Sequence, residues 1–91
     1  MSVTIKLPTQ LRAAAGGAVE AQADGGTVGE VLESLYGTHG ELRDRIAGEG
    51  GELRRFVNVY VGGEDIRFLE GLATPVADGD EVTILPAVAG G

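Results

Sequence analysis

The residues with the clearest chemical potential are the last two of the chain, Gly90 and Gly91. A terminal Gly-Gly presents a carboxylate on a thin strand. Because glycine has no Cβ, that strand can pass through a channel too narrow for any other residue. An enzyme that takes the C-terminal carboxyl of a protein as its substrate needs such an end. Chain ends are also often frayed and without function, so the dipeptide alone leaves both interpretations open.

The rest of the chain offers few side chains for other chemistry. There is no cysteine, which excludes disulfides, thiolate metal sites and cysteine nucleophiles. The one histidine, His39, lies between glycines and is predicted to be a solvated loop residue. The run Asp78-Gly79-Asp80 lacks the further oxygen ligands of a calcium loop and predicts a turn. We therefore expect no cofactor, no metal and no active site, and predict that the protein is not an enzyme.

The composition is that of one small globular domain covering residues 1–91. Hydrophobic residues make up 43% of the chain and charged residues 23%, a balance that supports one modest core. The first residues lack the apolar stretch of a signal peptide, and no stretch approaches the ~20 apolar residues of a membrane span. We predict a soluble, cytoplasmic protein with no membrane partner.

The net charge of −7 limits the choice of partners. Nucleic acids and anionic membranes attract basic surfaces, so the charge argues against both. An acidic surface favours encounters with basic proteins, although it also has the simpler effect of keeping the protein soluble.

Alternation of apolar and polar residues predicts several strands. The clearest cover residues 3–7, 56–61 and 81–85. A weaker strand at 18–23 would form a hairpin with the first, across a wide loop, and a short edge strand is expected at 66–68. Glycine pairs and the Asp78–Asp80 run supply the turns.

One strong helix is predicted after the first hairpin. Thr27 and Glu30 have the spacing of a capping box, and Gly37 suits the position that follows a helix. Apolar residues between them recur on one helix face: Val28, Val31, Leu32, Leu35 and Tyr36. Thr38 and Glu41 repeat the box, which predicts a second, short helix that ends by Gly48.

The order of these elements predicts an α+β domain in which the main helix covers one face of a mixed sheet. The first and last strands alternate most cleanly and are expected side by side in its centre. This is the β-grasp (ubiquitin-like) arrangement, with a flexible tail over residues 86–91. The expected core consists of Val3, Ile5, Leu7, Val28, Val31, Leu32, Leu35, Val57, Val59, Val82 and Ile84.

A β-grasp domain with a Gly-Gly end resembles ubiquitin, and more closely the ThiS/MoaD family of ubiquitin-like sulfur carrier proteins. The run from Ala77 to Gly91 is similar to that family's ending, with an acidic turn, a strand, a proline, small residues and Gly-Gly. The stretch from Arg55 to Arg67 looks most like the actinobacterial members that serve cysteine biosynthesis.

The resemblance implies a mechanism. An E1-like adenylating enzyme would activate the Gly91 carboxylate with ATP, and a sulfur donor would displace AMP to leave a thiocarboxylate. The carrier would then deliver sulfur to a biosynthetic synthase, most directly for cysteine, and a metalloprotease is a further expected partner. Gly90 and Gly91 would be the reacting end, and the protein a co-substrate.

The alternation of the strands also predicts a partner surface. If residues 82 and 84 face the helix, Thr83 and Leu85 lie on the open face, where Thr4, Lys6, Asn58 and Tyr60 should join them. An exposed leucine and tyrosine beside the tail suit a docking surface, with Pro86 and Val88 next to it. The alternative is a scatter of surface apolar residues without function.

Other functions stay open at this point. The same chemistry would serve a thiosugar or other secondary metabolite, molybdopterin, or the thiazole of thiamine. A ubiquitin-like modifier, joined through Gly91 to lysines of target proteins, is a different class. A β-grasp interaction module with a functionless tail is a third.

Overall fold

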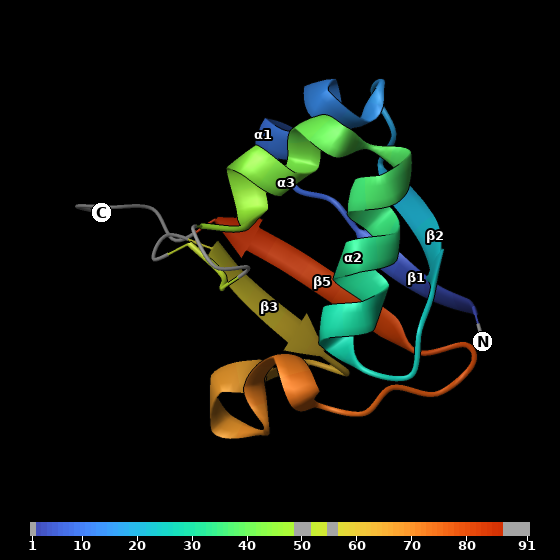
Figure 1. The fold of residues 1–91 in the computed structure, drawn as a ribbon, viewed down its shortest axis with the longest axis vertical. Coiled ribbons are helices and arrows are strands. Elements are labelled where there is room, and N and C mark those ends of the chain that lie inside the picture. The colour runs from blue at the N-terminus through green and yellow to red at the C-terminus, as the bar shows by residue number, and fades with distance from the viewer. Residues whose placement is uncertain (1, 49–51, 55–56, 87–91) are drawn as a thin grey trace.

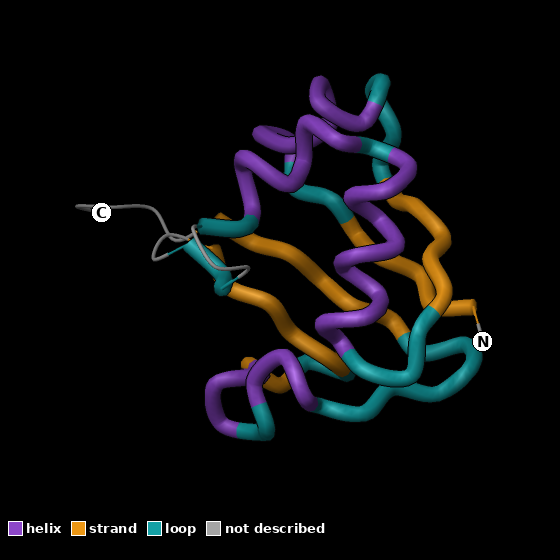
Figure 2. The backbone as a smooth tube through the Cα atoms, viewed as in Figure 1, coloured by secondary structure: helices purple, strands orange, loops and turns teal. Residues whose placement is uncertain are grey.

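The computed structural model describes residues 2–48, 52–54 and 57–86. Their centre is a five-stranded mixed sheet with the order β2-β1-β5-β3-β4 (Figures 1 and 2). The strands are β1 (Ser2–Lys6), β2 (Glu20–Asp24), β3 (Val57–Val61), β4 (Glu64–Asp65) and β5 (Glu81–Pro86). The first and last strands are parallel neighbours in the centre of the sheet, and the other strand pairs are antiparallel. The predicted β-grasp arrangement is confirmed.

Two helices, α2 (Val28–Thr38) and α3 (Gly40–Ile46), pack on one face of this sheet (Figure 1). The predicted cap of α2 is present, because the Thr27 hydroxyl accepts a hydrogen bond from the Glu30 N–H at 3.2 Å. The Glu30 carboxylate accepts in turn from the N–H of Gly26 at 2.8 Å, one residue before the expected partner. The Thr27 side chain thus satisfies one N-terminal donor of α2, and the Glu30 side chain satisfies the N–H of the residue before the cap.

The core lies between these helices and the sheet. Every residue predicted for it is buried. Further buried residues outside that list are Leu42 and Ile46 of the predicted second helix, Ile66 of the predicted edge strand, and Leu11 and Val76 from segments that were not assigned to an element. No helix in the described part of the chain is long and apolar enough to cross a membrane.

The prediction for one short segment was wrong, and the loop of the first hairpin contains structure that was not predicted. Residues 66–68 form a 3₁₀ turn, η3 (Ile66–Phe68), and not an edge strand, because the Asp65 carboxylate accepts a hydrogen bond from the Arg67 N–H at 2.9 Å and turns the chain. The expected loop of the first hairpin contains a short helix, α1 (Thr9–Arg12), and a 3₁₀ turn, η1 (Ala13–Ala15).

The boundary between the two main helices also differs from the prediction. Gly37 and Thr38 belong to α2, since the His39 N–H donates to the Leu35 carbonyl at 2.8 Å and continues the helical pattern. Thr38 caps nothing, and its hydroxyl donates back to the Ser34 carbonyl at 3.5 Å. His39 is half-buried at this junction rather than fully solvated.

Truncation of Leu32, which is buried in the core, tests the helix assignment. We expect Leu32→Ala to lower the free energy of unfolding by about 2–5 kcal/mol, because it leaves a cavity between α2 and the sheet. The matched control is Leu69→Ala, at a residue that is 40% exposed. Urea denaturation followed by circular dichroism gives both values. Equal losses in the two variants would contradict the packing described here.

Tyr36 provides a test of core packing by pH. Burial raises the pKa of Tyr36 to about 12, with Glu33 adding to the rise and Arg43 opposing it. The folded-state pKa lies above the unfolded value of 10.0, so the unfolded chain loses this proton first. The free energy of unfolding should therefore fall as pH rises from about 10 to about 12. Urea denaturation across this window should show a smaller fall for Tyr36→Phe, and parallel curves would contradict the assignment.

Candidate functional site

The predicted reacting end lies outside the described residues. This applies to Gly90 and Gly91, and also to Val88, which was expected to contribute to docking. The structure does describe the strand that leads to them. β5 pairs with β1 over residues 81–83 and with β3 over residues 82–86, so it enters the tail region from the centre of the sheet.

The two faces of β5 differ sharply in their surroundings. Val82 and Ile84 are 0% exposed and belong to the core on the helix side. Thr83 is half-buried and Leu85 is 44% exposed on the opposite face. The period of two in the sequence thus places one large apolar side chain on the open face, directly before the tail.

The register brings the predicted docking residues together. Asn58 lies opposite Leu85, and Tyr60 lies opposite Thr83. Residues directly opposite in neighbouring strands project from the same face of a sheet, so these four side chains form one cluster, here called the sheet-face patch. Pro86 ends β5 opposite Val57, and only its main chain is described.

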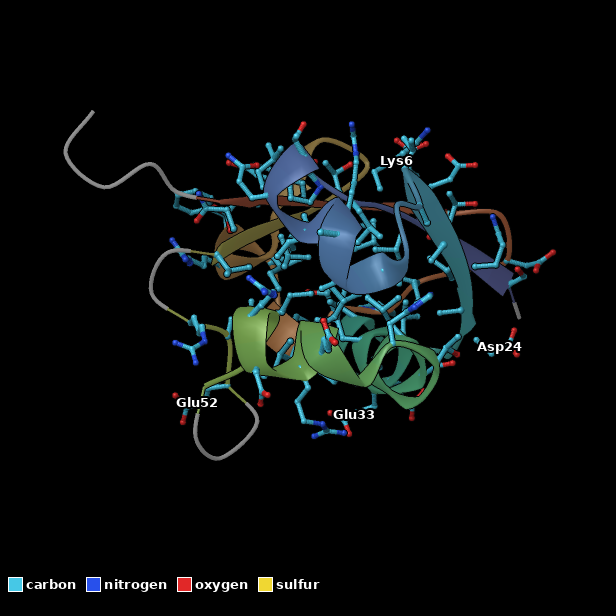
Figure 3. The ribbon with its side chains drawn as sticks, turned by 90° about the horizontal axis from the view of Figure 1, so that it is seen from above. Lys6, Asp24, Glu33 and Glu52 are labelled. Atoms are coloured by element: carbon cyan, nitrogen blue, oxygen red, sulfur yellow. The ribbon has the colours of Figure 1, made fainter. Side chains whose placement is uncertain are left out.

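Lys6 lies beside the sheet-face patch, opposite Thr83 in the parallel register. Figure 3 shows it on the side of the sheet away from α2 and α3. Its ammonium group is 2.8 Å from the Glu20 carboxylate. The pKa of Lys6 is raised, first by its hydrogen bond to Glu20 and further by the charges of Glu20 and Glu81. The sheet-face patch therefore consists of apolar and neutral polar side chains, and one ion-paired cation, Lys6, lies next to it.

This arrangement suits binding better than catalysis. Over the described residues, the surface has no pocket, and no three acidic or histidine side chains converge as metal ligands. Asp78-Gly79-Asp80 is a turn, in which the Asp80 carboxylate accepts from the Ala77 N–H at 2.8 Å. An exposed apolar side chain with neutral polar neighbours is compatible with a surface that a partner protein covers.

Sequence reasoning missed three residues that the structure brings to attention, all in or next to η3. Phe68 is 86% exposed and Leu69 is 40% exposed, although both are apolar. Arg67 donates from Nη2 to the carbonyl of Val57 at 3.0 Å, ten residues earlier in the chain. The signal for this turn was Asp65, because an aspartate side chain favours a turn at the two residues that follow it.

Comparison with known proteins agrees with this geometry. The ThiS family matches residues 5–91. The sulfur carrier protein CysO of Mycobacterium tuberculosis is 50% identical over the whole of both chains. The fold and the strand that carries the Gly-Gly end define a ubiquitin-like carrier, a class of co-substrate proteins and not of enzymes. The chain belongs to the ThiS family.

Two solved structures extend the comparison. A chain in the crystal structure of the Amycolatopsis orientalis BexX/CysO complex has a TM-score of 0.90 and 47% identity, with 98% of this chain and 99% of that chain covered. The small archaeal modifier protein SAMP1 of Haloferax volcanii has a TM-score of 0.85 and 35% identity, with both chains fully covered. The first of these shows that carriers of the CysO type form complexes with other proteins.

Proposed function

We propose that this protein is a sulfur carrier whose Gly91 carboxylate is adenylated and converted to a thiocarboxylate, most directly for cysteine synthesis. The observation that carries the proposal is the 50% identity to a CysO sulfur carrier over the full length of both chains. The geometry supports it, because the central strand β5 ends at Pro86 beside an open docking face. We further propose that residues 1–91 form one domain with residues 86–91 as its tail.

The chemistry explains why activation is required. A carboxylate is a poor electrophile, because attack on it must expel oxide. Attack of the Gly91 carboxylate on the α-phosphorus of ATP releases pyrophosphate and gives an acyl-adenylate, whose AMP is a good leaving group. A sulfur nucleophile at the oxidation state of sulfide then adds to the acyl carbon and expels AMP, which leaves the thiocarboxylate. The carrier supplies the acyl group, and all catalytic groups belong to its partners.

The proposed partners follow from these steps. An E1-like adenylating enzyme would dock on the sheet-face patch of Asn58, Tyr60, Thr83 and Leu85 and receive the tail. The five residues beyond Pro86 extend at most about 16–18 Å, enough to reach a buried site in a partner. A sulfur-accepting synthase would receive the same tail. A metalloprotease fits as well if the product stays joined to Gly91 by an amide, since hydrolysis must then restore the carboxylate.

One alternative has an observation in its favour. Similarity to SAMP1, a protein named as a modifier, fits a role in which Gly91 is joined to lysines of target proteins. The two roles share the acyl-adenylate and differ in the nucleophile that follows. A modifier would produce higher-mass ladders of conjugates in lysate, whereas a carrier would not. A thiosugar, molybdopterin or thiazole acceptor would change only the synthase, and a cytoplasmic location stays a prediction.

Changes in the tail test the proposed chemistry. We expect deletion of Gly91, or Gly90→Val, to abolish formation of the acyl-adenylate and thiocarboxylate while the melting temperature stays unchanged. The deletion moves the carboxylate by about 3.3–3.6 Å along the chain, and an error of ~1 Å can cost 10²-fold. Intact-protein mass spectrometry after incubation with the adenylating enzyme, ATP and sulfide reads the oxygen-to-sulfur exchange. Equal exchange in the variants, or exchange elsewhere in the wild type, would exclude this function.

Leu85→Asp tests the docking surface. Because Leu85 is on the open face, the variant should fold normally and bind the adenylating enzyme at least about tenfold more weakly, as loss of an apolar anchor predicts. Ile84→Asp is the matched neighbour, and it should unfold the protein because a lone carboxylate would enter the core. Calorimetric titration and thermal denaturation give the two readouts. Unchanged affinity in folded Leu85→Asp would show that the enzyme docks elsewhere.

A further inference from the structure

The C-terminal end of β5 is held by fewer neighbours than its beginning. β1 accompanies β5 only over residues 81–83, whereas β3 pairs with it as far as Pro86. Within the described residues, the last pair of this register joins Val57 to Pro86. The direction in which the chain leaves the sheet therefore depends on how firmly the first residues of β3 are held.

The main-chain groups of Val57 are bonded on the side away from β5. The Val57 N–H donates to the Arg54 carbonyl at 3.0 Å, and the Val57 carbonyl accepts from Arg67 Nη2 at 3.0 Å. Pro86, across from Val57, has no N–H and suits a pair without hydrogen bonds between the strands. Val57 is thus fixed from outside the β3–β5 pair, by one main-chain bond and by one side chain.

The next pair of the register, Asn58 with Leu85, differs from Val57 and Pro86 in its hydrogen bonding. Antiparallel pairs alternate between bonded and unbonded forms, so Asn58 and Leu85 form the hydrogen-bonded pair nearest to the tail among the described residues. The bond from the Gly62 N–H to the Glu81 carbonyl, at 3.5 Å, falls on the same alternation. If Val57 is less firmly held, the hydrogen bonds between Asn58 and Leu85 should therefore open more often.

Two hydrogen bonds fix the conformation of the turn that contains Arg67. The Asp65 carboxylate accepts from the Arg67 N–H at 2.9 Å, and the Leu69 N–H donates to the Ile66 carbonyl at 3.0 Å. The Ile66 side chain is buried in the core. The planar guanidinium of arginine is a preorganised donor, and here it spans from η3 along the edge of β3, beyond the two residues of β4, to Val57.

We propose that Arg67 is a positioning residue for the tail. Through its bond to the Val57 carbonyl it holds the start of β3 against the end of β5, and so fixes the direction in which residues 87–91 leave the sheet. The inference rests on the proposed function, since direction matters only if a partner must receive Gly91. The direction of the chain at Pro86 decides which region an arm of at most about 16–18 Å can reach, and misplacement of a reacting group by ~1 Å can slow a reaction 10²-fold.

Three variants separate this role from a general loss of charge or fold. Arg67→Met removes the donors and keeps an unbranched apolar chain. Arg67→Lys keeps the charge and a donor at the end of the side chain. Arg45→Met is the matched control, since Arg45 is an exposed arginine on α3 and its replacement removes the same charge. Amide hydrogen exchange is measured by NMR, and thiocarboxylate formation by mass spectrometry with the adenylating enzyme of the same organism, ATP and sulfide.

In Arg67→Met, the amides of Asn58 and Leu85 should exchange about tenfold faster or more, while amides of α2 keep their protection. Its kcat as a substrate of the adenylating enzyme should fall about tenfold, with KM within about twofold, because docking is preserved and delivery is not. Arg67→Lys should recover a large part of both properties, and Arg45→Met should match the wild type.

Unchanged exchange at Leu85 in Arg67→Met overturns the inference, as does faster exchange with an unchanged kcat. A loss of protection throughout α2 would assign Arg67 to global stability, and overturns it too. If wild-type protein gains no thiocarboxylate, the proposed function fails. The amide hydrogen-exchange measurement would still decide whether Arg67 holds the end of β5.

Discussion

The structure depends on the burial of one face of β5. Val82 and Ile84 are fully enclosed between the sheet and the helices, with β1 and β3 on either side of the strand. Because side chains alternate along a strand, this burial forces Thr83 and Leu85 onto the open face. A shift of one residue would expose Ile84 and bury Leu85. The core therefore fixes which side chains of β5 belong to the proposed docking surface.

This constraint separates stability from function. The apolar core between α2, α3 and the sheet supplies the stability, since burial of apolar surface is the main favourable term in folding. The two ion pairs of the described residues, Lys6–Glu20 and Arg43–Glu33, are exposed and contribute little. The proposed reacting group, the Gly91 carboxylate, follows the last strand in the sequence.

The same division explains how one fold serves both carriers and modifiers among its relatives. After adenylation the acyl group is chemically the same in both roles. The outcome is set by the nucleophile that a partner presents, which this chain does not supply. The contribution that we propose for this chain is to present Gly91 to a partner, and the contacts of β3 with the end of β5 are the part of the described structure that bears on this proposal.

Periods of apolar residues in the sequence predict four of the five strands of the described residues, the main helix and the core. The predicted reacting end, Gly90 and Gly91, lies outside the described residues. The sequence also predicts the central pairing of β1 with β5 and the open-face residues of β5, because alternation along one strand decides which side chains share a face. It failed at residues 66–68 and at the junction of α2 with α3. There a single hydrogen bond, accepted by the Asp65 carboxylate or donated by the His39 N–H, outweighs a short and ambiguous pattern. Only the tertiary structure placed Arg67 on the carbonyl of Val57. That contact joins residues of two elements whose relative position follows from the packing of the whole sheet, and no local period encodes it.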